Sequence, residues 1–469
     1  MAATRKIEIV VLGGGPGGYC AAIRAGALGK KALVIEKDRV GGTCLNRGCI
    51  PTKALLSATE FLEEAAEWKK AGISAENVRV DVPAMQRWNA GVVKKLVSGV
   101  EGLFKANGVE WVNGAGRFTG PKIVAVMTAA GEETFEADSV ILATGSEPSG
   151  LPTLPVDGQR IITSDHVLFL ESAPKSMLVV GAGAVGLELA TVYNRLGTKI
   201  IVVELMPQIL PGVDKDLAAQ LHRALKKRGM EIHVNSKVTE CATGATAATL
   251  SVETPDGVKT FDVEKVLVAV GRRPVTRGIG LETTGVTPDS RGFISVGPAR
   301  ETTVKGFYAI GDITGNPMLA HKAMKEGIVA AEVIAGLPSE FDPRSIPGVV
   351  YTEPEVAWAG LTEDEAKAAG HEVATGQFPF VASGRALSMN HTEGFVKIVA
   401  DRGTDLLLGM QILGHGASEF MGEASLALEM GATAHDIGYS IHPHPTLSEG
   451  IMEAAEQVHG KAIHILNRK

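Results

Sequence analysis

Short apolar runs that stop at glycines dominate the hydrophobic pattern of the chain. The run at residues 7–12 breaks at the glycine-rich residues 13–18, and a helical pattern then covers residues 19–28. A second apolar run at residues 32–35 ends at Glu36. This order predicts a strand, a tight turn, a helix, a second strand and an acidic residue at the end of that strand.

The same order recurs in the middle of the chain. Apolar residues 177–180 lead into the glycine-rich residues 181–186, a helical pattern follows, and the run at residues 199–203 ends at Glu204. Two copies of one strand–turn–helix unit predict an α/β fold with two Rossmann-like dinucleotide-binding domains.

The second unit is expected to be inserted in the first domain. Residues 147–158 are rich in proline and glycine and are interpreted as a linker, and residues 307–312 are interpreted as a strand returning to the first domain. From about residue 345 the pattern changes to short strands and then helices, without a glycine fingerprint. We therefore expect a first nucleotide domain over residues 1–150 and 276–344, a second over 151–275, and an α+β C-terminal domain over 345–469.

Composition limits the possible classes of function. The chain has 469 residues, 45% hydrophobic and 21% charged, which is ordinary for a multidomain globular protein. A net charge of −7 argues against a dedicated nucleic-acid or anionic-membrane binder. The chain has 4 cysteines, too few for a secreted disulfide scaffold, and the run at 7–12 is too short for a signal peptide. No segment is expected to span a bilayer, and a reducing cytoplasm is the expected compartment.

Cys44 and Cys49 form the first segment with chemistry of its own. A disulfide closing so short a loop contributes only about 2 kcal/mol in the chain-entropy model, so the pair indicates a dithiol that cycles rather than a framework bridge. Two alternatives are buried structural thiols and half of a zinc site. Cys20 and Cys241 stand alone, however, and no metal site is predicted. Arg47 and a nearby helix N-terminus are groups that can lower the pKa of a thiol.

The second unusual segment is IHPHPTLSE, residues 441–449. Prolines on both sides hold His444 on a rigid backbone, and Glu449 is positioned to orient the imidazole and raise its basicity. A His–Glu pair suits proton transfer to and from thiols near neutral pH. Taken alone, the segment is equally consistent with a surface turn.

The two glycine loops have the context that dinucleotide binding requires. The first glycine turns the chain, the second lets the backbone approach a pyrophosphate, and the third lets the helix pack on its strand. The alternative is a glycine-rich turn without a ligand. Glu36 and Glu204 are expected to accept hydrogen bonds from adenosine ribose. Glu204 would repel a 2′-phosphate, and residues 205–207 contain no arginine, which favours NAD over NADP.

Together these motifs make the chain resemble the flavoprotein disulfide reductases, class I of the pyridine nucleotide-disulfide oxidoreductase family. Within that family it is most similar to the dihydrolipoamide dehydrogenase branch, the E3 components of 2-oxo acid dehydrogenase complexes. The doubled His-Pro and the segment PMLAHK favour this branch over glutathione reductase. The resemblance covers nearly the whole chain and is carried by residues 13–18, 41–53, 143–145, 181–186, 311–312, 317–322 and 442–449.

The resemblance implies that FAD binds the first unit and NAD the second. It also implies that Lys53 lies by the flavin and pairs with Glu188. The implied FAD residues are Gly13, Gly15, Gly18, Glu36, Thr43, Lys53, Gly116, Thr144, Gly145, Asp312 and Ala320. The implied NAD residues are Gly181, Gly183, Gly186, Glu188, Glu204, Val238 and Gly271.

The implied catalytic residues are Cys44, Cys49, His444 and Glu449. Cys44 would exchange with a dihydrolipoyl group, and Cys49 would face the flavin. His444, held by Glu449 and followed by a cis proline bond, would reach the dithiol of the other subunit of a homodimer. The C-terminal domain would form the dimer interface. The implied partners are lipoyl-bearing domains and the E2 cores of 2-oxo acid dehydrogenase or glycine cleavage complexes.

Two rival interpretations are weighed by what the chain lacks or keeps. Glutathione-type relatives carry arginines after the second unit, and mercuric reductases use an extra cysteine pair, whereas residues 461–469 hold none. A non-catalytic relative would have lost a dithiol cysteine or the histidine base, and all three are present.

Arg47 departs from an apolar position in many relatives, and Cys241 is interpreted as a buried small hydrophobe. Because the chain starts at the first strand, no fused lipoyl domain is expected.

Overall fold

The computed structural model describes residues 4–467, so residues 1–3 and 468–469, at the outer ends of the first and last expected domains, lie outside it. The chain divides into two compact units, each assembled from three segments. The first unit takes the N-terminal residues up to Leu55, Pro83–Ser149 and Gly271–Asp342. The second takes Leu56–Val82, Gly150–Val270 and the residues from Pro343 onward. The expected domain boundaries stay a prediction.

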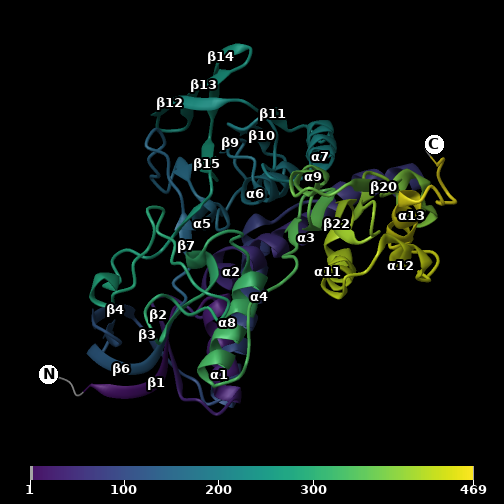
Figure 1. The fold of residues 1–469 in the computed structure, drawn as a ribbon. Coiled ribbons are helices and arrows are strands. Elements are labelled where there is room, and N and C mark those ends of the chain that lie inside the picture. The colour runs from purple at the N-terminus through teal and green to yellow at the C-terminus, as the bar shows by residue number, and fades with distance from the viewer. Residues whose placement is uncertain (1–3, 468–469) are drawn as a thin grey trace. The chain divides into compact units, whose positions relative to one another are not determined.

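A seven-stranded sheet forms the core of the first unit, in the order β3-β2-β1-β6-β5-β4 with β17 beside β6 (Figure 1). β1 pairs in parallel with β2 and β6, and β17 also pairs in parallel with β6, so the predicted first strand and return strand are confirmed. All residues of β2 are buried, which explains its unbroken apolar sequence. The strands are β1 Arg5–Leu12, β2 Ala32–Glu36, β3 Glu110–Asn113, β4 Ala115–Gly120, β5 Ile123–Thr128, β6 Gly131–Leu142 and β17 Phe307–Ala309.

Helices α1 (Pro16–Ala27) and α8 (Ala320–Ile334) lie side by side in the first unit (Figure 1). A Cβ at Gly327 would lie 2.3 Å from the carbonyl oxygen of Gly17, so the two helices approach too closely for any side chain there. α1 begins earlier than the sequence pattern predicts, because Pro16 suits the first helical turn. The other helices that begin in this part of the chain are α2 Gly42–Arg47, α3 Cys49–Glu67 and α4 Val82–Ala106.

The second unit contains the other predicted nucleotide fold. Its five strands, ordered β11-β10-β9-β15-β8, all pair in parallel. An antiparallel sheet β12-β13-β14 follows β11 in the chain. The elements are β8 Ile161–Ile162, α5 Ser164–Val167, β9 Ser176–Val180, α6 Ala184–Arg195, β10 Lys199–Val203, α7 Lys215–Lys227, β11 Glu231–His233, β12 Lys237–Thr243, β13 Ala248–Thr254, β14 Gly257–Val263 and β15 Lys265–Val268.

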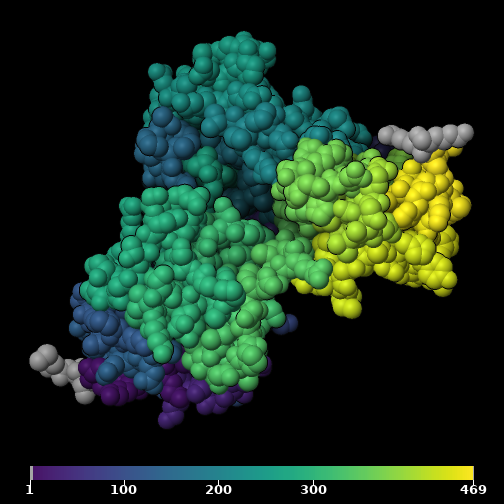
Figure 2. Space-filling view, viewed as in Figure 1, coloured from purple at the N-terminus to yellow at the C-terminus, as the bar shows by residue number. Residues whose placement is uncertain are grey.

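The C-terminal part of the second unit is an antiparallel sheet, β18-β19-β22-β21-β20, with helices packed on it. Every residue of β22 is buried, so this strand lies in the middle of the sheet and of its core. The C-terminal helices form one continuous yellow surface (Figure 2). The elements are β18 Gly348–Val350, β19 Glu355–Gly360, α9 Glu363–Ala368, β20 Val373–Pro379, α10 Gly384–Met389, β21 Phe395–Asp401, β22 Leu407–Gly414, α11 Met421–Met430, α12 Ala434–Tyr439 and α13 Glu449–Val458.

Two sequence interpretations need correction. The start of the expected linker is β7 (Ser146–Pro148), which pairs with β16 (Arg272–Pro274) in an antiparallel ribbon. Cys241 is only half-buried on β12 and packs at the edge of a core cluster, because its strand lies in the small outer sheet. Among residues 4–467, none of the helices combines the length and apolar character needed to cross a membrane.

Candidate functional site

The first glycine loop is shaped by backbone contacts that exclude side chains. Gly13 has φ +111, and a Cβ there would lie 2.2 Å from the carbonyl oxygen of Ala143. A Cβ at Gly18 would lie 1.9 Å from the oxygen of Gly13. Gly15 caps α1 without any side-chain hydrogen bond, so the first N–H groups of the helix stay available to an anion.

Glu36, at the end of β2, is held beside this loop by two hydrogen bonds. Its carboxylate accepts the Gly14 N–H at 2.7 Å and the Asp38 N–H at 2.9 Å. The side chain is thus fixed at the end of its strand and next to the loop, as required of an acid that accepts a ribose hydroxyl.

The dithiol segment packs directly on the first loop. The Gly41 N–H donates to the Gly14 oxygen at 2.7 Å, and a Cβ at Gly42 would lie 2.6 Å from the Cα of Gly15. Both glycines have positive φ, and α2 starts immediately after Gly41. Cys44 therefore lies on a short helix that follows the nucleotide loop, and Cys49 begins α3.

The side chains of Cys44 and Cys49 are hydrogen-bonded to each other. That hydrogen bond and burial raise the pKa of Cys44, while the Lys53 ammonium lowers it by less. The Arg47 Nη1 donates to the Asp38 carboxylate at 2.6 Å.

Asp312 lies on the turn Gly311–Thr314, and the carboxylate of Asp312 is among the groups that raise the pKa of Cys44. Its Oδ2 accepts the Ser146 hydroxyl at 2.5 Å, and Arg272 Nε donates to the same hydroxyl oxygen at 2.7 Å. Ser146 and Arg272 were not predicted as site residues. Arg272 follows Gly271 directly, and this adjacency was the available signal.

A buried charge cluster holds the turn Gly311–Thr314 in place through hydrogen bonds and ion pairs. Glu326 is fully buried on α8 and accepts the Gly311 N–H at 2.6 Å. Lys322 and Arg300 contact the Glu326 carboxylate at 3.1 and 2.9 Å. Lys322 belongs to the predicted segment 317–322, but Glu326, one helical turn later, was missed.

The second glycine loop repeats the first in the second unit. Gly181 has φ +101 with a Cβ position 2.5 Å from the Ala269 oxygen, and a Cβ at Gly186 would lie 2.2 Å from the Gly181 oxygen. Gly183 caps α6, again without a side-chain hydrogen bond. Glu204 accepts the Ala182 N–H at 2.7 Å and the Met206 N–H at 2.8 Å, which is the arrangement seen for Glu36.

The remaining predicted cofactor residues differ in what surrounds them. A Cβ at Gly116 would lie 2.7 Å from Leu12 Cδ1, so packing inside the first unit already requires this glycine. The Val238 side chain is buried in the core of the second unit, which leaves its backbone for any ligand contact. Glu188 is buried and accepts the Tyr351 N–H at 3.0 Å. The Lys53–Glu188 pair stays a prediction.

Other predicted residues are placed by their backbone. Thr43 lies in α2, Gly145 has φ +69, and Ala320 is the first residue of α8. The Thr144 hydroxyl donates to the Val275 oxygen at 2.5 Å. Gly271 has φ +111 and belongs to the first unit, apart from the other predicted NAD residues.

His444 and Glu449 form the predicted pair. His444 Nδ1 lies 2.8 Å from Glu449 Oε1, and the Thr446 N–H donates to the other carboxylate oxygen at 2.8 Å. Burial alone would raise the pKa of Glu449, but these hydrogen bonds outweigh it and lower the pKa. With Nδ1 bonded to the carboxylate, Nε2 is left as the basic nitrogen. The His444–Pro445 bond is cis, as expected.

The doubled His-Pro segment separates into a buried and an exposed histidine. His442 is 7% exposed and contacts Glu423 at 2.9 Å, a partner that its sequence position did not indicate. His444 is 79% exposed. Large apolar side chains of the same domain are also exposed, namely Leu426, Met430, Tyr439 and Ile441. Exposed apolar side chains of this size are typical of surfaces that bind another protein.

The two loops and their acids fit dinucleotides. Gly15 and Gly183 each start a helix whose first N–H groups have no side-chain cap, and a side chain at either position would occupy the space in front of those groups. Each loop also has a carboxylate at the end of the following strand. The donors and acceptors present suit a pyrophosphate and a ribose at both sites.

Comparisons with known proteins agree with this geometry. Residues 7–327 match the description "pyridine nucleotide-disulphide oxidoreductase", and residues 346–455 match its dimerisation domain. A dihydrolipoyl dehydrogenase of Thermus scotoductus is 50% identical over 99% of this chain and 100% of its own length. That of Geobacillus stearothermophilus is 45% identical over 99% of this chain and 98% of its own length.

Solved structures show the same fold. LpdA from Mycobacterium tuberculosis superimposes with a TM-score of 0.89 at 28% identity, covering 96% of this chain and 99% of LpdA. The Escherichia coli flavoprotein disulfide reductase RclA gives a TM-score of 0.86 at 23% identity over 97% of this chain and 99% of its own. The cofactors that the two loops fit are FAD and NAD. This chain belongs to the pyridine nucleotide-disulphide oxidoreductase family.

Proposed function

We propose that the protein is a homodimeric dihydrolipoyl dehydrogenase that oxidises protein-bound dihydrolipoamide to lipoamide with NAD⁺. The observation that carries the proposal is the joint presence of a dithiol packed on one dinucleotide loop, a second such loop and an exposed His–Glu pair. The identity to dihydrolipoyl dehydrogenases over their full length supports the same substrate. Glu204 supports NAD rather than NADP.

In the proposed reaction His444 Nε2 takes a proton from one substrate thiol. The resulting thiolate attacks Cys44 of the oxidised Cys44–Cys49 pair, so that an S–S bond forms to substrate and Cys49 leaves as thiolate. The second substrate thiol then displaces Cys44 and closes the lipoyl disulfide. The substrate loses two electrons and the enzyme disulfide gains them.

The cofactors supply the rest of the redox chemistry when bound, carrying the electron pair from the dithiol to NAD⁺. The contribution of the chain is to hold the groups. Glu449 fixes the tautomer of His444, and the Ser146 hydroxyl, itself contacted by Arg272, orients the carboxylate of Asp312, which would be one of the residues that hold FAD. The matched dimerisation domain and the exposed apolar side chains near His444 support a base acting on the partner subunit's dithiol.

The proposal extends to partners and place of action. A lipoyl-bearing domain is the proposed substrate, and the E2 core of a 2-oxo acid dehydrogenase or glycine cleavage complex is the proposed docking partner. A reducing cytoplasm suits a dithiol in a chain with few cysteines. These points follow from the proposed activity and are tested with it.

The test is the reduction of NAD⁺ by dihydrolipoamide, followed at the nicotinamide absorbance band, with NADP⁺ in parallel. His444→Gln should slow this reaction by about 100-fold or more, because the general base is lost. Oxidation of NADH by an artificial acceptor should stay near the wild-type rate. A matched control is His464→Gln, since His464 forms a similar pair with Glu453 at 2.6 Å. Equal losses in both assays, or no activity with NAD⁺, would contradict the proposal.

A further inference from the structure

Two histidines and a glutamate converge in the second unit, in a place that the proposed reaction does not use. Glu353, His391 and His415 offer ligand atoms that all lie within 4.8 Å of one another. We propose that this Glu353–His391–His415 cluster is a binding site for a divalent transition-metal ion such as Zn²⁺ or Co²⁺. The proposal does not depend on the dehydrogenase activity, and it departs from the expectation of no metal site.

The three side chains come from positions that the backbone fixes. Glu353 stands between β18 and β19, directly before Pro354. His391 follows Asn390, which ends α10 in a left-handed conformation with φ +58, and its N–H donates to the Ala386 oxygen at 3.0 Å. His415 follows β22, whose residues are all buried. A site whose ligands stand on fixed backbone loses little conformational entropy on binding.

The spacing of the ligand atoms leaves room for an ion. Glu353 Oε1 lies 3.7 Å from His391 Nδ1, and its Oε2 lies 3.8 Å from His415 Nδ1. Both distances exceed a hydrogen bond. Two ligands bound to Zn²⁺ at about 2.0–2.1 Å are roughly 3.4 Å apart at a tetrahedral angle, so the two Glu–His distances need only a small contraction.

The imidazoles are stacked, with ring centroids 3.9 Å apart and 19° between planes. The neutral form of imidazole is the one that binds a metal, so each ring must present an unprotonated nitrogen to the ion. Coordination turns one ring about its Cβ–Cγ bond until its lone pair meets the ion. Imidazole and carboxylate donors together suit zinc and cobalt.

The surroundings carry excess negative charge. Glu60 lies 4.0 Å from His415 Nδ1, and Glu64 lies 3.8 Å from His391 Nε2. Glu60 and Glu64 are one turn apart on α3, so both carboxylates face the cluster from the same helix. Burial and the Glu353 carboxylate raise the pKa of Glu60, a repulsion that a bound cation would relieve. Glu355 is a further buried acid beside the cluster and bonds the Ser418 N–H at 2.8 Å.

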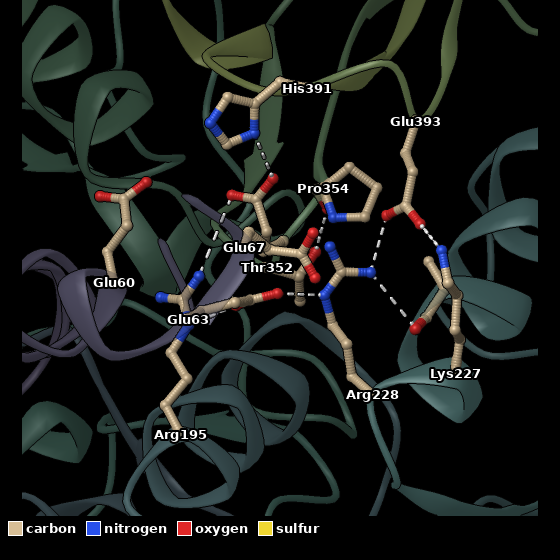
Figure 3. Close-up of polar contacts among 12 residues, drawn as sticks. Glu60, Glu63, Glu67, Arg195, Lys227, Arg228, Thr352, Pro354, His391 and Glu393 are labelled. Atoms are coloured by element: carbon tan, nitrogen blue, oxygen red, sulfur yellow. Dashed lines mark hydrogen bonds and ion pairs between the residues drawn. The ribbon is translucent and has the colours of Figure 1, made fainter. Parts of the chain in front are cut away.

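The nearest cation is already engaged elsewhere. Arg195 lies 3.9 Å from Glu353 Oε2, but its Nε donates to Glu63 at 2.9 Å. Figure 3 shows Glu63 between Arg195 and Arg228, with Glu393 and Lys227 beyond Arg228. His391 points toward this network from the opposite side (Figure 3). Arg195 and Arg228 thus balance the charges of Glu63 and Glu393, while the Glu353 carboxylate, with Arg195 at 3.9 Å, lies within reach of both histidines.

The experiment uses the oxidised, FAD-loaded protein without reductant, so that the dithiol does not compete for metal. After chelator treatment, Zn²⁺ is titrated in by calorimetry and Co²⁺ by its visible d–d absorption. The expected result is one ion per chain. His391→Ala and His415→Ala should each weaken binding by about 100-fold or more, since each removes a ligand.

The matched control is His459→Ala. His459 also lies near a second histidine, His435, and contacts Asp405 at 3.3 Å, but these groups do not form a closed cluster. The affinity of the His459→Ala variant for Zn²⁺ should stay within about twofold of wild type. Flavin content and circular dichroism of each variant report on folding. No saturable binding by wild type, binding unchanged in both histidine variants, or binding lost in Cys44→Ser instead, would overturn the proposal.

Discussion

The two glycine loops have nearly the same internal geometry, but the chain segments that pack on them differ. In each, the loop carbonyl after the first glycine accepts an N–H from the segment that follows the ribose acid, Gly41 to Gly14 at 2.7 Å and Leu210 to Ala182 at 2.9 Å. In the first unit the covering segment continues as Gly42 and α2, directly against Gly15. In the second, no described residue lies within 4 Å of a Cβ placed at Gly183.

We expect this difference to affect how long a bound dinucleotide stays. The dithiol segment packs on the first loop, so a dinucleotide held there should leave slowly. No comparable glycine contact is found at Gly183 among the described residues, so a dinucleotide held at the second loop should exchange more easily. The segment that follows the acid is the expected source of this difference.

The largest expected effect is on the dithiol reaction, which can be lost while both glycine loops stay intact. Cys44→Ser should lower dihydrolipoamide-dependent NAD⁺ reduction by more than about 1,000-fold, because the exchange sulfur is lost. Flavin content should remain unchanged, since the loop contacts do not involve this side chain. NADH oxidation by an artificial acceptor is the second readout, and Cys20→Ser is the control. Wild-type turnover in Cys44→Ser would contradict the assignment of the dithiol.

The next effect tests the enclosed loop. Gly42→Ala should reduce flavin content about tenfold or more and destabilise the protein by about 1–3 kcal/mol, because Gly42 has φ +55 and a Cβ would meet Gly15 at 2.6 Å. Flavin absorbance per chain and thermal unfolding measure the two losses. Full flavin content in a stable Gly42→Ala variant would show that packing of the dithiol segment on this loop is not needed to hold the flavin.

The open loop should respond differently to the same change. Gly183 has φ −78 and open space around its Cβ position, so Gly183→Ala should keep wild-type stability and flavin content. The KM for NAD⁺ should rise about tenfold, about 1.4 kcal/mol, because a methyl group stands where the pyrophosphate approaches. Loss of flavin or of stability in this variant would show that the two loops are not independent.

The smallest expected effect is on stability and comes from Glu449, which lies outside both loops, so it serves as a reference for the other predictions. The pKa of Glu449 is lowered in the folded protein from an ordinary value of 4.5. Its ionisation therefore stabilises the fold above pH 4.5, and this contribution is lost as pH falls through the folded pKa. Glu449→Gln should lose about 0.5–1.5 kcal/mol near pH 7 and progressively less as the pH falls below 4.5 through the folded pKa. Thermal unfolding of both proteins across this pH range is the measurement, and a constant difference would contradict it.

The local motifs were predictable because each is contiguous in sequence. A glycine loop, its strand and its acid follow one another within about thirty residues, so their chemistry and their geometry share one short segment. The same holds for the His444–Glu449 pair, where five positions and two prolines define the contact. The predicted return strand was confirmed for a similar reason, since β17 repeats the apolar run ending in glycine.

The supporting groups were not predictable, because they come from distant parts of the chain. Arg272 donates to the Ser146 hydroxyl oxygen and Ser146 donates to Asp312, and no spacing in the sequence relates these three residues. Gly116 has a packing explanation that only the contact with Leu12 reveals. The ion pair of Arg47 with Asp38 was not predicted for the same reason.

Sequence alone therefore determined the fold class, the family, the two cofactor loops and the dithiol, because these are written in local patterns of residues. Tertiary structure decided what surrounds them. Packing of Gly42 on Gly15 distinguishes the enclosed loop from the open one, although the loops read alike. Folding of β18, α10 and β22 also brings Glu353, His391 and His415 together. Contacts between residues far apart in the chain have no local signature, so only the folded backbone reveals them.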